Sequence, residues 1–203
     1  GDPTRKRKVI VYARKHADRN AYELTINALS QAACHRVFAE NWEFIGMGAP
    51  DDYTEHLGMP CGKKIEMRIR KNVPENEYRQ LVQTGDVGLS LMISPHPSLP
   101  PFDLVAAGLV TVTNSFGTKT APLLEAVSKN FVVAQPFLKS VVKALVRAAA
   151  KAGDVTQRLE NAAHMNWESN WLGDRCFGPP LMELVKGWFE VHEPLWPYEK
   201  AFE

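Results

Sequence analysis

The alternation of short β-branched runs with longer helical patterns constrains this chain more than any other feature of its sequence. It extends from residue 7 to about residue 135. Several of the short runs are almost continuously apolar, as is typical of strands that are buried on both faces of a parallel sheet. The pattern predicts an α/β fold, a doubly wound parallel sheet with helices on both faces. The predicted strands are Lys8–Ala13, Trp42–Met47, Lys64–Ile69, Val87–Ile93, Leu109–Thr113 and Phe131–Ala134.

Helical patterns lie between these strands, and a different composition follows them. The clearest predicted helices are Ala21–Cys34, Glu75–Thr84 and Pro101–Ala107. We predict a Rossmann-like domain over residues 1–153 and a helical tail over residues 154–203. The tail is rich in tryptophan, with Trp167, Trp171, Trp188 and Trp196. A solvated helix does not need so many aromatic side chains, so we expect the tail to pack on the domain or on a region absent from this chain.

Charge and cysteine usage exclude several classes of protein. With 24 basic and 23 acidic residues, the net charge of +1 gives no global field that would select nucleic acid or an anionic membrane. Cys34, Cys61 and Cys176 are odd in number and widely spaced, which fits neither a disulfide framework nor a zinc site. No apolar run approaches the roughly 20 residues that span a bilayer. We therefore expect a cytoplasmic location.

The first candidate site follows the first predicted strand. No Gly-x-Gly-x-x-Gly and no phosphate loop occurs there, which disfavours a plain NAD enzyme or a P-loop ATPase. Instead the segment Ala13–Asn20 carries several cations at the carboxyl end of a strand, where doubly wound sheets bind ligands. Arg14 and Arg19 are spaced to clamp two phosphate groups beside a helix N-terminus, with Asn20 next to them. A solvated basic loop is the alternative.

The second candidate site follows the predicted strand that ends at Ile93. Four prolines stiffen this loop, so Ser94, His96 and Ser98 can be presented to a phosphate or a sugar with little loss of entropy on binding. The next helix carries Phe102 and Asp103 in its first turn. Asp103 either stabilises the helix dipole or accepts hydrogen bonds from a ribose diol. His96 either anchors the loop or contacts a sugar.

At these residues the sequence resembles the C-terminal domain of GT-B glycosyltransferases, in the retaining group that includes sucrose and glycogen synthases. Arg14 and Arg19 have the spacing of the Arg and Lys that contact the donor pyrophosphate in that family. The segment Ile45–Gly48 matches its Val-Gly-x-Gly pattern, and Asp103 takes the place of the second of two conserved glutamates. The first of these glutamates is replaced by Pro95.

The string Leu-Met-Ile-Ser-Pro-His-Pro-Ser-Leu-Pro-Pro is similar to WsaF-like rhamnosyltransferases of bacterial surface-polysaccharide synthesis. This resemblance implies a nucleotide diphosphate sugar, such as dTDP-rhamnose, as donor substrate, with no metal and no other cofactor. It implies that Asp103 holds the ribose and that the strand end with Arg70 and Val73 lines the base pocket. The glycan acceptor would bind through an N-terminal domain absent from this chain, at the periphery of the inner membrane face.

The expected function is therefore the donor-binding half of a glycosyltransferase that adds a sugar to a polysaccharide. We expect the isolated domain to bind nucleotide sugar weakly and to turn over nothing alone. Two alternatives remain open, because this fold hosts many activities. One is another GT-B enzyme, such as a nucleotide-sugar epimerase, and the other is a non-catalytic, flavodoxin-like binding module.

Overall fold

The computed structural model describes residues 5–165, except residues 40, 59, 60, 63 and 97. They form a seven-stranded sheet in the order β3-β4-β2-β1-β5-β6-β7, in which only the pair of β3 and β4 is antiparallel. The strands are β1 (Arg7–Tyr12), β2 (Trp42–Ala49), β3 (Tyr53–Gly58), β4 (Lys64–Lys71), β5 (Val87–Leu89), β6 (Val110–Asn114) and β7 (Phe131–Ala134). The predicted α/β class and doubly wound parallel sheet are confirmed.

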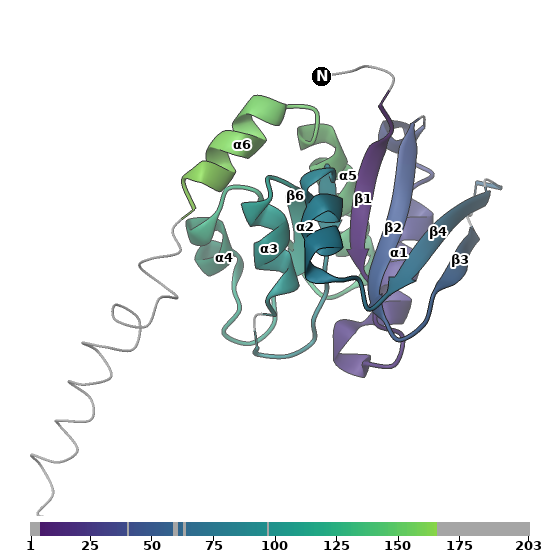
Figure 1. The fold of residues 1–203 in the computed structure, drawn as a ribbon. Coiled ribbons are helices and arrows are strands. Elements are labelled where there is room, and N and C mark those ends of the chain that lie inside the picture. Colours follow the sequence, from purple (N-terminus) through teal and green to yellow (C-terminus); the bar gives the residue numbers. More distant parts are fainter. Residues whose placement is uncertain (1–4, 40, 59–60, 63, 97, 166–203) are drawn as a thin grey trace, which may run out of the picture. The chain divides into compact units, whose positions relative to one another are not determined.

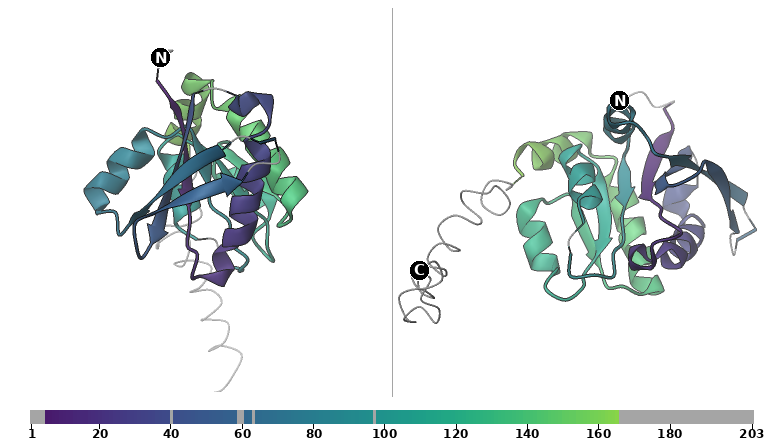
Figure 2. Two further views of the ribbon diagram at one scale, coloured as in Figure 1. Left: turned by 90° about the vertical axis from the view of Figure 1, so that its right-hand side faces the viewer. Right: turned by 60° about the horizontal axis from the view of Figure 1, so that its bottom comes forward.

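Helices cover both faces of the sheet. They are α1 (Tyr22–Ala32), α2 (Glu75–Gln83), α3 (Pro100–Ala106), α4 (Ala121–Val127), α5 (Leu138–Lys151) and α6 (Val155–Ala163), with short 3-10 helices η1 (Asp18–Asn20) and η2 (Arg36–Phe38). Helices α1 and α5 pack on one face, and α2 and α3 pack on the other (Figures 1 and 2). The three predicted helices correspond to α1, α2 and α3, whereas α4 was not predicted.

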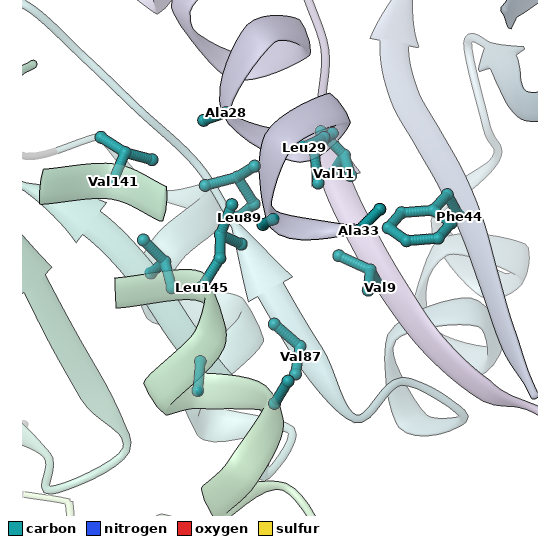
Figure 3. Packing of buried hydrophobic residues seen from close by; sticks show 14 of the residues in the cluster. Val9, Val11, Ala28, Leu29, Ala33, Phe44, Val87, Leu89, Val141 and Leu145 are labelled. Carbon is teal, nitrogen blue, oxygen red and sulfur yellow. The ribbon is translucent and has the colours of Figure 1, made fainter. Parts of the chain in front are cut away.

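The central strand β1 shows why both faces need covering. Its side chains alternate between the two faces of the sheet, as in any strand. Val9 and Val11 lie in the larger core cluster with Leu29 of α1 and Leu145 of α5 (Figure 3). Ile10 lies in the smaller cluster under α2 and α3. The consecutive apolar residues Val9, Ile10 and Val11 therefore reflect burial of this strand on both faces of the sheet.

Strand β3 is missing from the prediction, which had six strands. It lies at the edge of the sheet and pairs with β4 alone, and Leu57 is its one buried residue. An edge strand with a solvated face does not need an apolar sequence, so its polar residues gave no strand signal. The predicted strand Val87–Ile93 is too long, because β5 ends at Leu89. Beyond it, the amide of Ser90 still donates to the carbonyl of Val112 at 3.0 Å.

The expectation that the cysteines form no disulfide is wrong. Cys34, which follows α1, is bonded to Cys61 in the connection between β3 and β4, with the Cα atoms 5.8 Å apart. The edge hairpin lies against α1, where the hydroxyls of Tyr22 and Tyr53 are 3.0 Å apart. The pairing depends on a hairpin that the sequence did not reveal, so cysteine spacing gave no sign of it. Cys176 lies outside the described residues.

The compact unit that contains the sheet extends through α6 to Met165, past the predicted domain end at residue 153. Arg158 fastens α6 to the sheet. Its buried guanidinium donates to the backbone carbonyls of Asp86 and Gly108 at 3.1 Å each, and to the Asp86 carboxylate at 3.2 Å. Arg5 pairs with the same carboxylate at 2.6 Å. The tryptophan-rich segment from residue 166 onward, with its predicted packing, lies outside the described residues.

Candidate functional site

Strands β1 and β5 are parallel neighbours in the middle of the sheet, and the direction of the winding changes between them. From β1 the chain builds outward through β2 to β4, and it then returns to build β5, β6 and β7 on the other side. Doubly wound sheets bind ligands outside the carboxyl ends of the strands at such a point. The loops that follow β1 and β5 therefore define the candidate site.

A cavity of about 390 Å³ lies at these two loops. Six of the eight predicted donor-binding residues line it, and the described lining residues are Tyr12, Arg14, Arg19, Asn20, Met92, Ser94, His96, Ser98, Leu99 and Pro100. These described residues include two guanidinium groups and no carboxylate. The balance of charge favours an anionic ligand.

Arg14 reaches the cavity through a close approach of two strand ends. The amide of Ala13 donates to the carbonyl of Met47 at 2.8 Å, which holds the end of β1 against β2. Gly48 has a φ of 93°, and a Cβ atom there would lie 2.8 Å from the ring of Tyr12 and 3.2 Å from Cγ of Arg14. Gly48 thus leaves the space in which both side chains lie. The glycine pattern noted in the sequence has a structural reason at this position.

Arg19 and Asn20 come from η1, just before α1. The carbonyl of Arg19 accepts a hydrogen bond from the amide of Ile93 at 2.6 Å, which ties the two loops of the site together. The Asn20 side chain is 1% exposed, and neither its Nδ2 nor its Oδ1 has a hydrogen-bond partner. An unpaired buried amide is costly, and such groups in native proteins call for an explanation. Asn20 is one of the residues that line the cavity, and both of its amide atoms are buried.

The loop after β5 is curled by its own side chains. The Ser94 hydroxyl accepts from the amide of His96 at 3.2 Å, and Nδ1 of His96 accepts from the amide of Ser98 at 3.0 Å. Since Nδ1 is an acceptor, the neutral imidazole carries its proton on Nε2, which is left to donate. Ser98 has a φ of 68°, in the left-handed region, at the point where the loop turns into α3. Both readings of His96, loop anchor and ligand contact, are compatible with this geometry.

Phe102, which was predicted as a donor contact, is a core residue in the structure, and its contact with the donor remains a prediction. Its side chain is 2% exposed and packs edge to face on Phe131, with ring centroids 5.3 Å apart. It does not belong to the cavity lining. The first turn of α3 directs this side chain into the core, because the helix needs an apolar face against the sheet.

Asp103 lies outside the lining of the 390 Å³ cavity. Its carboxylate accepts a hydrogen bond from the Tyr78 hydroxyl at 3.1 Å, which links α3 to α2. Burial raises the pKa of Asp103, and the hydrogen bond from Tyr78 opposes this shift. Burial, followed by the charge of Asp103, raises the pKa of Tyr78. The predicted contact of Asp103 with ribose remains a prediction.

The two predicted base contacts are also separate from this cavity. Arg70 lines another cavity, of about 530 Å³, on the β2–β4 side of the sheet. Its guanidinium is paired with the Glu77 carboxylate at 2.7 Å. Val73 packs against the smaller core cluster. Their role in binding a base remains a prediction.

Lys119 is a residue of this region that the sequence did not single out. It lies between β6 and α4 and is 5% exposed, and its Nζ donates to the carbonyl of Met92 at 3.1 Å. Burial lowers the pKa of Lys119 to about 8. A single lysine in a polar turn gives no local signal, so only the position of that turn beside the β5 loop could have indicated it.

The described part of the chain contains neither a cluster of metal ligands nor a helix that could span a membrane. No group of three or more His, Cys, Asp or Glu side chains there is arranged to hold a metal ion. Among the same residues, no helix is both long and apolar enough to cross a membrane. The predictions of a metal-free site and of a cytoplasmic location are not decided by these findings.

The sequence matches one protein family over most of its length. The family profile of the WsaF C-terminal domain matches residues 7–146. The O-antigen biosynthesis protein RfbC of Myxococcus xanthus is 30% identical over 173 residues, which is 81% of this chain and 12% of RfbC. The chain thus corresponds to a small part of that relative.

Solved structures share the fold at low sequence identity. An α,α-trehalose 6-phosphate synthase from Burkholderia multivorans superposes with a TM-score of 0.65 at 13% identity, over 91% of this chain and 44% of that chain. WaaG, a glycosyltransferase involved in lipopolysaccharide biosynthesis, superposes with a TM-score of 0.57 at 14% identity, over 82% of this chain and 45% of that one. The predicted fold of a GT-B C-terminal domain is confirmed.

Proposed function

Because this chain belongs to the family of WsaF C-terminal domains, we propose that it is the donor-binding half of a glycosyltransferase of surface-polysaccharide synthesis. It holds a nucleoside diphosphate sugar while the sugar passes to a glycan acceptor. The relatives named O-antigen biosynthesis protein and lipopolysaccharide glycosyltransferase support this reading. We further propose rhamnose, carried as dTDP-rhamnose, as the sugar.

The unpaired amide of Asn20, a residue that lines a cavity together with two arginines, is the observation that carries the proposal. A nucleotide sugar offers phosphate oxygens, which accept hydrogen bonds, and sugar hydroxyls, which both donate and accept. Such a ligand satisfies Nδ2 and Oδ1 of Asn20 together, whereas an anion without a hydroxyl group satisfies only the Nδ2 donor. The unpaired amide destabilises the free protein, and a hydrogen bond to the ligand removes this destabilisation.

The chemistry of the proposed site is electrostatic. Arg14 and Arg19 neutralise the diphosphate, with bidentate hydrogen bonds where the geometry of the guanidinium allows. The charge that develops on the leaving nucleoside diphosphate then meets groups that are already in place, so no reorganisation is needed during the reaction. His96 can donate from Nε2 to the sugar or to a phosphate oxygen. No residue of this half is assigned to acid or base catalysis.

In this proposal, the acceptor binds to a part of the enzyme that is not included in this chain. The chain spans 12% of RfbC and somewhat less than half of each solved chain described above. We place the acceptor site on an N-terminal domain and the reaction in the cytoplasm, at the periphery of the membrane. The isolated chain should accordingly bind donor without transferring its sugar.

Calorimetric titration of the chain with dTDP, UDP, GDP and their sugar conjugates tests the proposal. We expect saturable binding of one nucleotide and tighter binding of its rhamnose conjugate than of its glucose conjugate. The variants are Arg19→Ala and Asn20→Ala, with Arg36→Ala as control, since Arg36 is exposed in η2 away from the cavity. Loss of a hydrogen bond to a charged group costs about 1.5–3 kcal/mol, so Arg19→Ala should weaken binding by at least about tenfold.

A separate variant, Asp103→Ala, tests the ribose contact. It should bind nucleotides more weakly than the wild type does, but it should bind a sugar phosphate, which has no ribose, equally well. If no nucleotide binds to a chain that circular dichroism shows to be folded, the donor-binding function is rejected. The alternative of a non-catalytic, flavodoxin-like binding module is then preferred. If Arg36→Ala weakens binding as much as Arg19→Ala does, the site has been placed wrongly.

A further inference from the structure

Lys119 is a buried cation without a counter-ion. The residue is 5% exposed, and the one hydrogen bond described for its side chain goes from Nζ to the carbonyl of Met92. Among the described residues, no carboxylate lies within ion-pair distance of it. Lysine is almost never fully buried unless it is paired, because removing an ammonium ion from water is expensive. The position of Lys119 therefore needs an explanation.

Met92 connects Lys119 to the cavity. Met92 belongs to the cavity lining, and its carbonyl accepts hydrogen bonds from Nζ of Lys119 and from Nδ2 of Asn114, each at 3.1 Å. The turn that carries Lys119 also approaches the β5 loop, since a Cβ atom on Gly117 would lie 4.0 Å from Pro95. A single residue thus separates the ammonium group from the cavity.

The groups that face this region are cationic or neutral. The lining contributes Arg14 and Arg19 from the loop after β1, His96 from the loop after β5, and Tyr12 from β1, and no carboxylate is among its described residues. Asn114 of β6 is neutral. Burial alone lowers the pKa of Lys119 to about 8, so the free protein holds this proton only in part at mildly alkaline pH. An anion in the cavity would be the missing counter-charge.

We propose that Lys119 is a positioning residue for the donor diphosphate, and that binding of the diphosphate transfers a proton from the solvent to the Lys119 amine. The inference rests on the function proposed above. A dianion near a buried amine favours its charged form, because the local dielectric is low and the attraction is poorly screened. The ammonium then holds the Met92 carbonyl and adds positive potential behind the arginines. Affinity for nucleotide should consequently depend on pH above neutrality.

Proton uptake on binding is the direct test. Nucleotide is titrated calorimetrically at pH 8.5 in two buffers with different enthalpies of ionisation, with dTDP, UDP and GDP as probes. If the bound state raises the Lys119 pKa by one unit, uptake at pH 8.5 is about half a proton, and Kd rises about sixfold from pH 7.5 to pH 9.5. Ordinary histidines titrate below this range, but a free thiol and the α-amino group titrate within it, so the proton is assigned by comparison with the Lys119→Arg variant.

Three variants separate charge from packing. Lys119→Arg keeps a cation that does not deprotonate, so it should bind without proton uptake and with little dependence on pH. Lys119→Met should bind more weakly and without uptake, while Lys143→Met, on the exposed side of α5, should behave as wild type. If Lys119→Met does not fold, the wild type and the arginine variant still decide.

Saturable binding by the wild type without proton uptake overturns the inference and leaves the proposed function intact. Uptake that persists in Lys119→Arg also overturns it, because another group must then take the proton. Failure of all three nucleotides to bind at pH 7.5 rejects the proposed function itself, and the inference with it.

Discussion

Replacing Asn20 with leucine should stabilise the free protein and remove its affinity for nucleotide. The amide of Asn20 is 1% exposed and has no hydrogen-bond partner at either atom. Leaving a buried polar group unpaired costs about 1–3 kcal/mol, because its water is lost without replacement. Leucine has a similar size and no polar atom, so the substitution should increase the free energy of unfolding by about 2 kcal/mol. For a chain of this length that corresponds to a rise of about 4–8 °C in Tm.

The assay is urea unfolding followed by circular dichroism, with a calorimetric Tm as a second measurement. Asn130→Leu is the matched control. Asn130 is also 1% exposed, but its Nδ2 donates to the carbonyl of Arg158 at 2.8 Å and its Oδ1 accepts from Asn161 at 3.0 Å. Leucine at position 130 leaves these buried partners without a hydrogen bond and should lower the free energy of unfolding by about 1–3 kcal/mol. The two asparagines are equally buried and should respond with opposite signs.

A loss of stability in Asn20→Leu comparable to that in Asn130→Leu would refute this reasoning. The Asn20 amide would then have a partner in the free protein, and its place in the cavity would be structural. If Asn20→Leu increases stability but leaves nucleotide affinity unchanged, the Asn20 amide is unpaired but does not contact the ligand. Opposite effects on stability and binding are what a preorganised binding residue should give.

Two further predictions concern stability. Cys34 and Cys61 are separated by 27 positions, so reducing their disulfide should lower the free energy of unfolding by about 3.5 kcal/mol through chain entropy. Urea unfolding with and without reductant measures this, and no change would mean that the bond is not formed in solution. Gly48→Ala should lower the free energy of unfolding by about 1–3 kcal/mol, because φ is 93° and the new methyl group meets an aromatic ring. The control Gly58→Ala meets nothing within 4 Å and should be nearly neutral in the same measurement. Equal effects of the two substitutions would contradict this.

The central parallel strands could be predicted from the sequence because strands buried on both faces of the sheet carry consecutive apolar residues. Val9, Ile10 and Val11 all lie in cores, two on one face and one on the other. The edge strand Tyr53–Gly58 has no such reason, since solvent covers one side of it, and it was missed. Arg14 and Arg19 were found for a similarly local reason. Both follow the end of one strand, and a strand end fixes the position of the residues directly after it.

What the sequence alone determined, then, is most of the parallel strands and of the helices between them, together with the two loops that meet at the carboxyl edge. The tertiary structure decided which side chains face the cavity. A helix rotates by about 100° per residue, so Pro100 at the start of α3 lines the cavity while Phe102, two residues later, packs on the core. It also brought Lys119 to Met92 and Cys34 to Cys61. Residues so far apart along the chain meet only through the packing of whole elements, which no local pattern specifies.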